Sequence, residues 1–134
     1  MKVFIDSNIP MYGAGRDHPK RAPALRFLAQ VQKREVDAFT STEVLQEILY
    51  RYSALGRYDL ARDVYNLFVE VCPVVLPVSL ADTDRARDLL GDATGISARD
   101  AIHAAVMMNH GIKKIATFDQ GFDRVAGVDR VDLI

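Results

Sequence analysis

The sequence predicts an α/β fold, in which a central parallel β-sheet lies between two layers of helices as an α/β/α sandwich. Short apolar runs, such as residues 2–5 and 114–117, alternate with longer segments whose apolar residues recur at helical spacing. Strands that alternate with helices are typical of a parallel sheet covered on both faces. The 134 residues suffice for one core and contain no repeat or linker, so we expect a single domain over residues 1–134.

The first half of the chain contains two strand patterns and three helix patterns. Residues 2–5 form an apolar run that stops at Asp6, and residues 36–40 form a second short run, so both are expected strands. Residues 13–19 hold two glycines and a proline and are expected to form a loop. Helices are expected at 20–35, from Ser41 or Thr42 to Gly56, and at 58–71.

The second half repeats this alternation. Ser97 is a typical N-cap and Gly111 a typical stop, which together predict a helix over 97–110. The other expected elements are a strand at 74–78, a helix at 81–90, a strand at 114–117, a short helical turn at 119–125 and an edge strand at 130–133.

Composition and charge exclude several classes of protein. The formal net charge is −1, whereas a protein that binds nucleic acid by bulk attraction is usually basic, so net charge gives no support to an RNA substrate. The lone Cys72 excludes an internal disulfide and lies in an apolar run where a buried structural thiol is expected. The first apolar run meets Asp6 too early for a signal peptide, and no run is long enough to span a bilayer. We therefore expect a cytoplasmic protein.

Four acidic residues are placed by this pattern near one edge of the sheet. Asp6 follows the first strand and Asp119 lies just beyond the strand at 114–117. Ligands of open α/β sheets bind outside the carboxyl ends of the strands. Asp100 lies in the first turn of its helix, where the helix dipole favours negative charge, and Glu47 lies in the opening turns of a helix that follows a strand.

Taken singly, most of these acids have simpler explanations. Asp100 is an ordinary charge for a helix N-terminus, and Asp119 is an ordinary loop residue with Asp123 as a second turn residue. Glu47, with Glu43 four residues before it, fits a solvated helix face. Asp6 has no such simple explanation, because it directly follows a buried strand. The joint placement of all four favours a site.

Clustered carboxylates repel one another and must either protonate in part or bind a cation. Hard oxygen ligands select Mg²⁺ or Mn²⁺, whereas zinc sites usually contain histidine or cysteine. Such ions activate water and stabilise the leaving oxygen of a phosphodiester, and either one or two ions would be compatible with four acids. Ser7 and Asn8 are expected to support Asp6 or to shape the turn, and Thr117 is expected on the same strand face as Asp119.

The four acids lie in four short motifs. The motifs are Val-Phe-Ile-Asp6-Ser-Asn, Ser41-Thr-Glu-Val-Leu-Gln-Glu47, Asp100-Ala-Ile-His-Ala-Ala and Thr117-Phe-Asp119-Gln-Gly-Phe. In this order and at this chain length, they resemble the PIN domain and in particular the VapC-like toxin ribonucleases. The resemblance selects Glu47 rather than Glu43 as the second acid, because the family has a glutamate six residues after the serine that matches Ser41.

The resemblance implies that Asp6, Glu47, Asp100 and Asp119 are the catalytic and metal-binding acids of a Mg²⁺- or Mn²⁺-dependent endoribonuclease. It implies a PIN-like fold, an antitoxin protein that blocks the site, inhibition of translation and a homodimer. Asp123 and Glu43 do not match the pattern and are expected only as supporting acids.

Three alternatives to the toxin function are considered. An RNA-processing enzyme and a catalytically silent RNA-binding module on the same fold both stay open. A receiver-type signalling domain is disfavoured, because it needs an acidic pair after the first strand and a lysine after a late strand, and Asp6 stands alone.

An acidic site needs basic neighbours to hold RNA, because phosphate contacts supply affinity without sequence choice. The candidate RNA contacts are Arg16, Arg99 and His103, the last of which lies one helical turn after Asp100. Further basic residues near the expected site, each equally compatible with a solvated surface, are Lys20, Arg21, Arg51, Arg57 and Arg62.

Aromatic residues are concentrated in the segment from 45 to 71, and two neighbouring helices cannot bury all of them against one core. We hypothesise that part of the set forms a groove for a partner segment or a dimer contact, against the alternative that most are core. The set is Tyr50, Tyr52, Tyr58, Tyr65 and Phe68.

Overall fold

The computed structural model describes residues 1–91 and 93–133. Within these residues the chain forms a five-stranded sheet of order β3-β2-β1-β4-β5, and every neighbouring pair of strands is parallel. The predicted parallel sheet is therefore confirmed, with the first strand at its centre. The strands are β1 (Lys2–Ile5), β2 (Asp37–Ser41), β3 (Val74–Leu76), β4 (Lys114–Ala116) and β5 (Asp129–Arg130).

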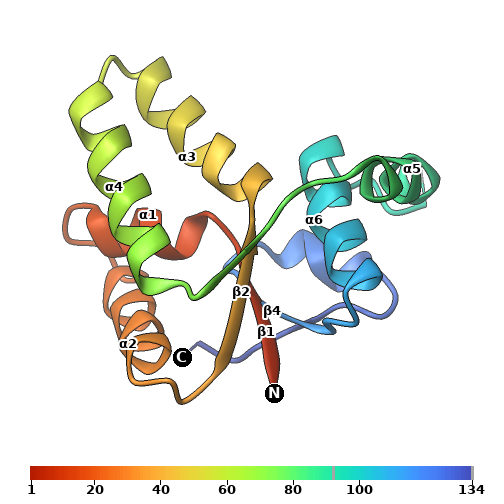
Figure 1. Ribbon diagram of the computed structural model, residues 1–134, viewed down its shortest axis with the longest axis horizontal. Helices are drawn as coiled ribbons and strands as arrows, with labels where there is room; N and C mark the ends of the chain where they lie inside the picture. Colours follow the sequence, from red (N-terminus) through yellow and green to blue (C-terminus); the bar gives the residue numbers. More distant parts are fainter. Residues whose placement is uncertain (92, 134) are drawn as a thin grey trace.

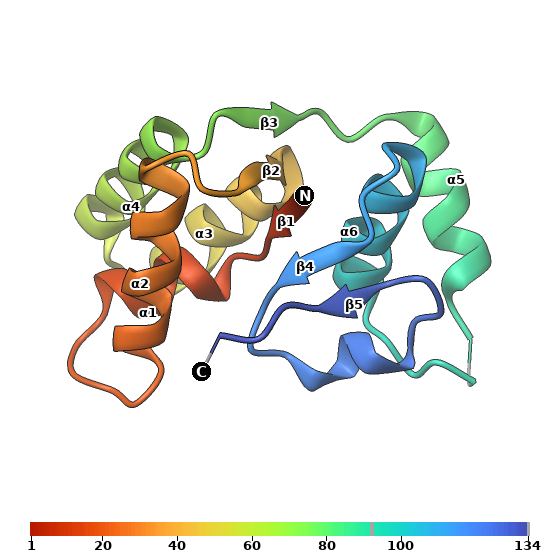
Figure 2. The same cartoon turned by 90° about the horizontal axis from the view of Figure 1, so that it is seen from below.

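Helices cover both faces of this sheet, which confirms the three-layer arrangement. Helices α1, α2 and α4 lie on one side, and α5 and α6 lie on the other (Figure 1). The same separation is visible from below in Figure 2, and α3 contacts both α4 and α6. The helices are α1 (Asn8–Ala14), α2 (Arg21–Gln32), α3 (Thr42–Ala54), α4 (Tyr58–Val71), α5 (Leu80–Leu89), α6 (Ala98–Asn109) and the short 3₁₀ helix η1 (Gln120–Arg124).

The strand β1 is buried because it pairs with β2 on one side and β4 on the other. Its residues Val3, Phe4 and Ile5 are fully buried, and the backbone N–H of Asp6 continues the pairing by donating to the carbonyl of Ala116 at 3.1 Å. In a parallel sheet all carboxyl ends lie at one edge. The segments that follow β1, β2 and β4 therefore begin side by side.

One expectation was wrong: the loop predicted at 13–19 begins only after a helix, α1, that the sequence did not predict. This helix has seven residues and contains Pro10 and Gly13, which are typical of turns. Pro10 is tolerated because it lies in the first turn, where its missing N–H would be unpaired. Gly13 is buried against α2, and a Cβ there would approach Leu28 to 3.2 Å. Close packing between helices, rather than local propensity, accounts for α1.

The remaining elements match their predicted ranges to within a few residues. The strand expected at 74–78 ends at Leu76, because Pro77 has no N–H to donate to the sheet. Cys72 is buried as expected, and burial raises the pKa of its thiol to about 11, which keeps the thiol protonated. Among the described residues, no helix combines the length and apolar character needed to cross a membrane.

Candidate active site

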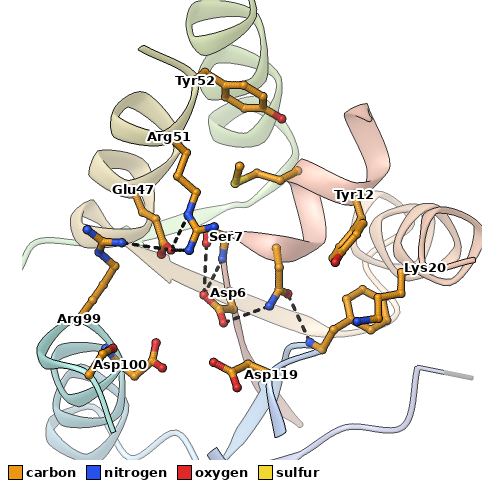
Figure 3. A pocket seen from close by; sticks show the side chains of 14 residues that line it. Asp6, Ser7, Tyr12, Lys20, Glu47, Arg51, Tyr52, Arg99, Asp100 and Asp119 are labelled. Carbon is orange, nitrogen blue, oxygen red and sulfur yellow. Dashed lines mark hydrogen bonds and ion pairs between the residues drawn. The ribbon is translucent and has the colours of Figure 1, made fainter. Parts of the chain in front are cut away.

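A pocket of about 510 Å³ opens at the carboxyl edge of the sheet, and the four acids predicted from the sequence all line it (Figure 3). They come from different elements: Asp6 from the end of β1, Glu47 from α3, Asp100 from α6 and Asp119 from the segment after β4. The other lining residues are Ser7, Asn8, Met11, Tyr12, Lys20, Arg51, Tyr52, Ser97, Arg99 and Phe118.

The carboxylate of Asp6 is 4% exposed and is held by hydrogen bonds from both sides. The backbone N–H of Ser7 donates to Oδ1 at 2.7 Å, and the hydroxyl of Thr117 donates to Oδ2 at 2.8 Å. Burial raises the pKa of Asp6, although His103 and the Thr117 hydrogen bond oppose the rise. The folded protein thus holds this carboxylate in one orientation while making its charge costly.

The expected supporting residues Asn8 and Thr117 tie the loop after β1 to the segment after β4. The Thr117 hydroxyl accepts from the amide of Asn8 and from the backbone N–H of Asp119, both at 3.0 Å. The Asn8 side-chain oxygen accepts from the backbone N–H of Phe118 at 3.3 Å. Thr117 lies beside Asp119 as expected, but its hydroxyl contacts the backbone N–H of Asp119 rather than the carboxylate.

The carboxylate of Glu47 is buried, so a solvated helix face is excluded for this residue. Its Oε2 lies 3.0 Å from Arg51 Nη2 and 3.5 Å from Arg99 Nη1. Burial acts to raise the pKa of Glu47, but hydrogen bonds from His103 and Ser7 and the charges of His103 and Arg51 lower it to about 2. Glu47 is therefore charged, and cations already surround it.

The prediction that His103 contacts RNA was wrong, because His103 is fully buried beneath the pocket. Its Nε2 lies 3.5 Å from Glu47 Oε1 and 3.6 Å from Asp6 Oδ1, and its ring packs against Phe4. Burial alone would lower the pKa of His103, yet the two carboxylates raise it. Its Nδ1 has no hydrogen-bond partner within the described part of the chain. The structure places His103 between two carboxylates, which favour the charged form of its ring.

The carboxylates of Asp6, Asp100 and Asp119 point toward a common space (Figure 3). The pKa of Asp100 is raised to about 6, first by burial and then by the charge of Asp6, with Asp119 contributing and His103 opposing. Asp119 is exposed and caps η1 by accepting from Gly121 N–H at 2.8 Å. Without a bound cation, Asp6, Asp100 and Asp119 repel one another, whereas the charge of Glu47 is balanced by the cations around it.

This donor set fits a hard divalent cation. Carboxylate oxygens facing one space are the ligands that such ions prefer, and a cation would relieve the raised pKa values of Asp6 and Asp100. Asp6, Glu47 and His103 also gather three potential ligand atoms within 4.8 Å of one another. Because His103 Nε2 lies between two carboxylates, the oxygens that face the pocket are the better donors. The buried acidic group can hold a metal ion.

Three predicted residues lie outside this arrangement. Asp123 forms hydrogen bonds of 2.9 and 3.0 Å with Arg130 and lines a separate pocket beside β5. Glu43 is half-buried and lies 3.5 Å from Arg99 rather than in the pocket. Arg16 is exposed and is not among the pocket residues, whereas Arg99, Arg51 and Lys20 are.

The aromatic set between residues 45 and 71 divides between core and surface. Tyr52 and Phe68 are buried and Tyr65 is half-buried, while Tyr50 and Tyr58 are 55% and 60% exposed. Two other aromatic residues in the pocket, Tyr12 and Phe118, were not among the predicted site residues. Tyr12 lies on the unpredicted helix α1, and the sequence signal for Phe118 is its place between the motif residues Thr117 and Asp119.

The raised pKa of Asp100 predicts a pH-dependent effect of Asp100→Asn on the metal-free protein. The folded state keeps the Asp100 proton up to about pH 6, whereas the unfolded chain releases it near 3.8, so wild-type stability falls as pH rises through this range. We expect the variant to melt at the same or a higher temperature than the wild type at about pH 7.5, with the difference shrinking toward about pH 4.5. Thermal denaturation with a chelator measures this.

The control for that measurement is Asp123→Asn, which removes an exposed acid paired with Arg130 and should give no gain at the higher pH. A clear drop in the melting temperature of Asp100→Asn at the higher pH would instead show that Asp100 has a structural role.

The position of His103 predicts a large structural cost for His103→Leu. The substitution leaves Asp6 and Glu47 buried without their shared partner, and breaking a buried charge pair costs about 3–5 kcal/mol of unfolding free energy. Urea denaturation near neutral pH measures the loss. The matched variant His110→Leu changes an exposed histidine at the end of the same helix and should cost less than about 1 kcal/mol. Equal losses for the two variants would contradict this role of His103.

The chain is similar to known proteins in both sequence and fold. Residues 3–128 match the PIN domain family. The chain is 40% identical to Ribonuclease VapC13 of Mycobacterium tuberculosis over 96% of this chain and 98% of that protein. It is 38% identical to Ribonuclease VapC23 of the same organism over 87% of this chain and 92% of that protein.

Solved structures share the fold at lower identity. VapC20 of Mycobacterium tuberculosis, described as a sarcin-ricin loop cleaving toxin, superposes with a TM-score of 0.77 at 22% identity, covering 92% of this chain and 95% of its own. VapBC2 from Rickettsia felis, bound to a DNA fragment from its promoter, gives a TM-score of 0.73 at 17% identity, covering 98% of this chain and 100% of that one. This chain belongs to the PIN-domain family, in the group that contains the proteins named VapC ribonucleases.

Proposed function

We propose that this chain is a metal-dependent endoribonuclease that cleaves RNA phosphodiester bonds and acts as the toxin of a VapBC-type pair, inhibiting translation. The observation that carries the proposal is the convergence of Asp6, Asp100 and Asp119, from three separate elements, on one pocket. Near full-length similarity to proteins named VapC ribonucleases supports it. Residues 1–134 would act as one domain in the cytoplasm.

The metal in this proposal is Mg²⁺ or Mn²⁺, held by Asp6, Asp100 and Asp119 with Glu47 beside them. Oxygen donors suit these ions, whereas the pocket offers neither a cysteine nor an accessible histidine for zinc. When bound, such an ion lowers the pKa of a coordinated water and offsets negative charge on a phosphate.

The protein's own groups supply orientation and charge balance. Thr117 and the backbone of Ser7 fix the direction of the Asp6 carboxylate. His103 holds Glu47 from below, while Arg51 pairs with it from the pocket side, where the Arg51 side chain is 55% exposed. Arg51 is therefore placed to contact an RNA phosphate without leaving the rim of the site. Such local cations explain how a chain of net charge −1 binds a polyanion.

The test is cleavage of structured RNA by the wild type and by single variants with Mg²⁺, Mn²⁺ or EDTA. We expect EDTA to abolish cleavage and Asp6→Asn, Asp100→Asn and Asp119→Asn each to lower the rate by about 100-fold or more, because each removes a carboxylate that would hold the metal ion and so weakens the stabilisation of charge at the reacting phosphate. The matched variant Asp123→Asn removes an acid outside the pocket and should cleave at nearly the wild-type rate.

Wild type that cleaves no faster than Asp119→Asn would refute the nuclease proposal and favour a catalytically silent binding module. Cleavage confined to one precursor RNA, without inhibition of translation, would favour an RNA-processing enzyme over a toxin.

We further propose that an antitoxin protein binds this chain and that two copies associate as a homodimer. Several structural neighbours are toxin–antitoxin complexes. An apolar groove of about 160 Å³ lies between α1, α2 and α4, and Phe68 from the aromatic set contributes to it. Two of its leucines, Leu25 and Leu67, are 40% and 59% exposed, which suits the apolar face of a partner segment. We place the antitoxin there.

The groove proposal predicts that Leu67→Glu weakens binding of the cognate antitoxin of the proposed pair, because it puts a charge in an apolar groove. We expect at least a tenfold rise in Kd by isothermal titration with RNA cleavage unchanged. The control Leu80→Glu changes a leucine that is 77% exposed at the start of α5, outside the groove, and should bind normally. Equal binding by both variants would place the partner elsewhere.

A further inference from the structure

One wall of the acidic pocket is aromatic. Tyr12 from α1 and Phe118, which lies between Thr117 and Asp119, line the same pocket as the carboxylates, and Lys20 lies beside them. Figure 3 shows Tyr12 and Lys20 across the pocket from Arg51 and Arg99. The two walls therefore differ in chemistry: one offers rings and a lysine, and the other offers arginines.

The aromatic wall is a compact cluster. The rings of Tyr12 and Phe118 meet edge to face, with centroids 5.4 Å apart and an interplanar angle of 84°. Lys20 Nζ lies 5.4 Å from the Tyr12 centroid and 5.6 Å from the Phe118 centroid. No carboxylate of the described residues lies within ion-pair distance of Lys20, so its ammonium group interacts with the two rings instead.

The position of Phe118 is coupled to the acids. Its backbone N–H is bound by Asn8, the preceding Thr117 holds Asp6, and the following residue is Asp119 itself. A group lying against the ring is therefore held at a constant offset from the carboxylates. Phe118 and Tyr12 are each half-buried, so part of each ring is available to a ligand in the pocket.

We propose that Tyr12 and Phe118 form a subsite for an unpaired nucleobase next to the cleaved phosphate, with Lys20 contacting a neighbouring phosphate. Nucleobases stack on aromatic side chains, and a lysine acts as a point charge for phosphate. This subsite rests on the proposed ribonuclease function, and it narrows the substrate to RNA that is single-stranded at the recognised nucleotide. Because every base has a π-face, stacking selects an unpaired base more than a particular sequence.

The test couples a protein ring to an RNA base. An RNA cleaved by the wild type is remade with a single abasic nucleotide at each position around the mapped cleavage site. We expect one abasic position to lower kcat/KM about tenfold, the order of a lost base–aromatic stack. Phe118→Leu and Tyr12→Leu should each cause a similar loss on intact RNA and little further loss on that abasic RNA. Phe118→Tyr keeps a ring at this position and should lose less activity than Phe118→Leu.

The matched control is Phe39→Leu, which removes another half-buried ring beneath a lysine, Lys2, away from the pocket. It should cleave intact and abasic RNA as the wild type does. As a second readout, 2-aminopurine at the sensitive position should be quenched on binding to Asp100→Asn, and adding Phe118→Leu should remove the quenching.

The outcomes separate this inference from the proposed function. No cleavage above that of Asp119→Asn refutes the ribonuclease. Cleavage with no sensitive abasic position, or a Phe118→Leu loss that is equally large on abasic RNA, overturns the subsite and leaves the rings a packing role. If Phe118→Leu fails to fold, Tyr12→Leu takes its place in both the cleavage and the 2-aminopurine measurements, with the same expected results.

Discussion

Asp6 is a carboxylate held 4% exposed at the end of the central strand, and the rest of the pocket is arranged around it. Burial disfavours its charge, and the protein offsets this with hydrogen bonds from the Ser7 backbone and the Thr117 hydroxyl and with the His103 ring 3.6 Å away. Those groups come from the segments after β1 and β4 and from α6. Holding one buried carboxylate therefore also fixes the relative positions of three parts of the chain.

The four acids do not form one uniform cluster. Glu47 is surrounded by cations and keeps its charge, with a pKa of about 2, while burial and then the neighbouring acids Asp6 and Asp119 raise the pKa of Asp100 to about 6. The inner part of the site, with His103 and the arginines, is balanced by the protein. The outer part stays unbalanced until a cation is present. This division between a balanced and an unbalanced half is the physical reason for proposing a metal site at the outer half.

The basic and apolar groups around the acids are sorted by position. Arginines from α3 and α6 lie on one side of the pocket, and the aromatic wall with Lys20 lies on the other. The apolar groove between α1, α2 and α4 is a separate surface. The proposed substrate site and the proposed partner site thus lie on different faces of the helical layer, although α1 contributes Tyr12 to one and Pro10 to the other.

The sequence by itself determined the parallel α/β architecture and the acids at its carboxyl edge, because strand ends and motif spacing are local patterns. It also selected Glu47 over Glu43 by spacing from Ser41, which the burial of Glu47 agrees with. The tertiary structure decided what depends on contacts between distant segments. Helix α1 exists through packing against α2, and His103 lies beneath the site because its face of α6 meets β1 and α3. Which side chains are exposed and which charges pair depends on neighbours remote in sequence, so no local sequence pattern predicts either property.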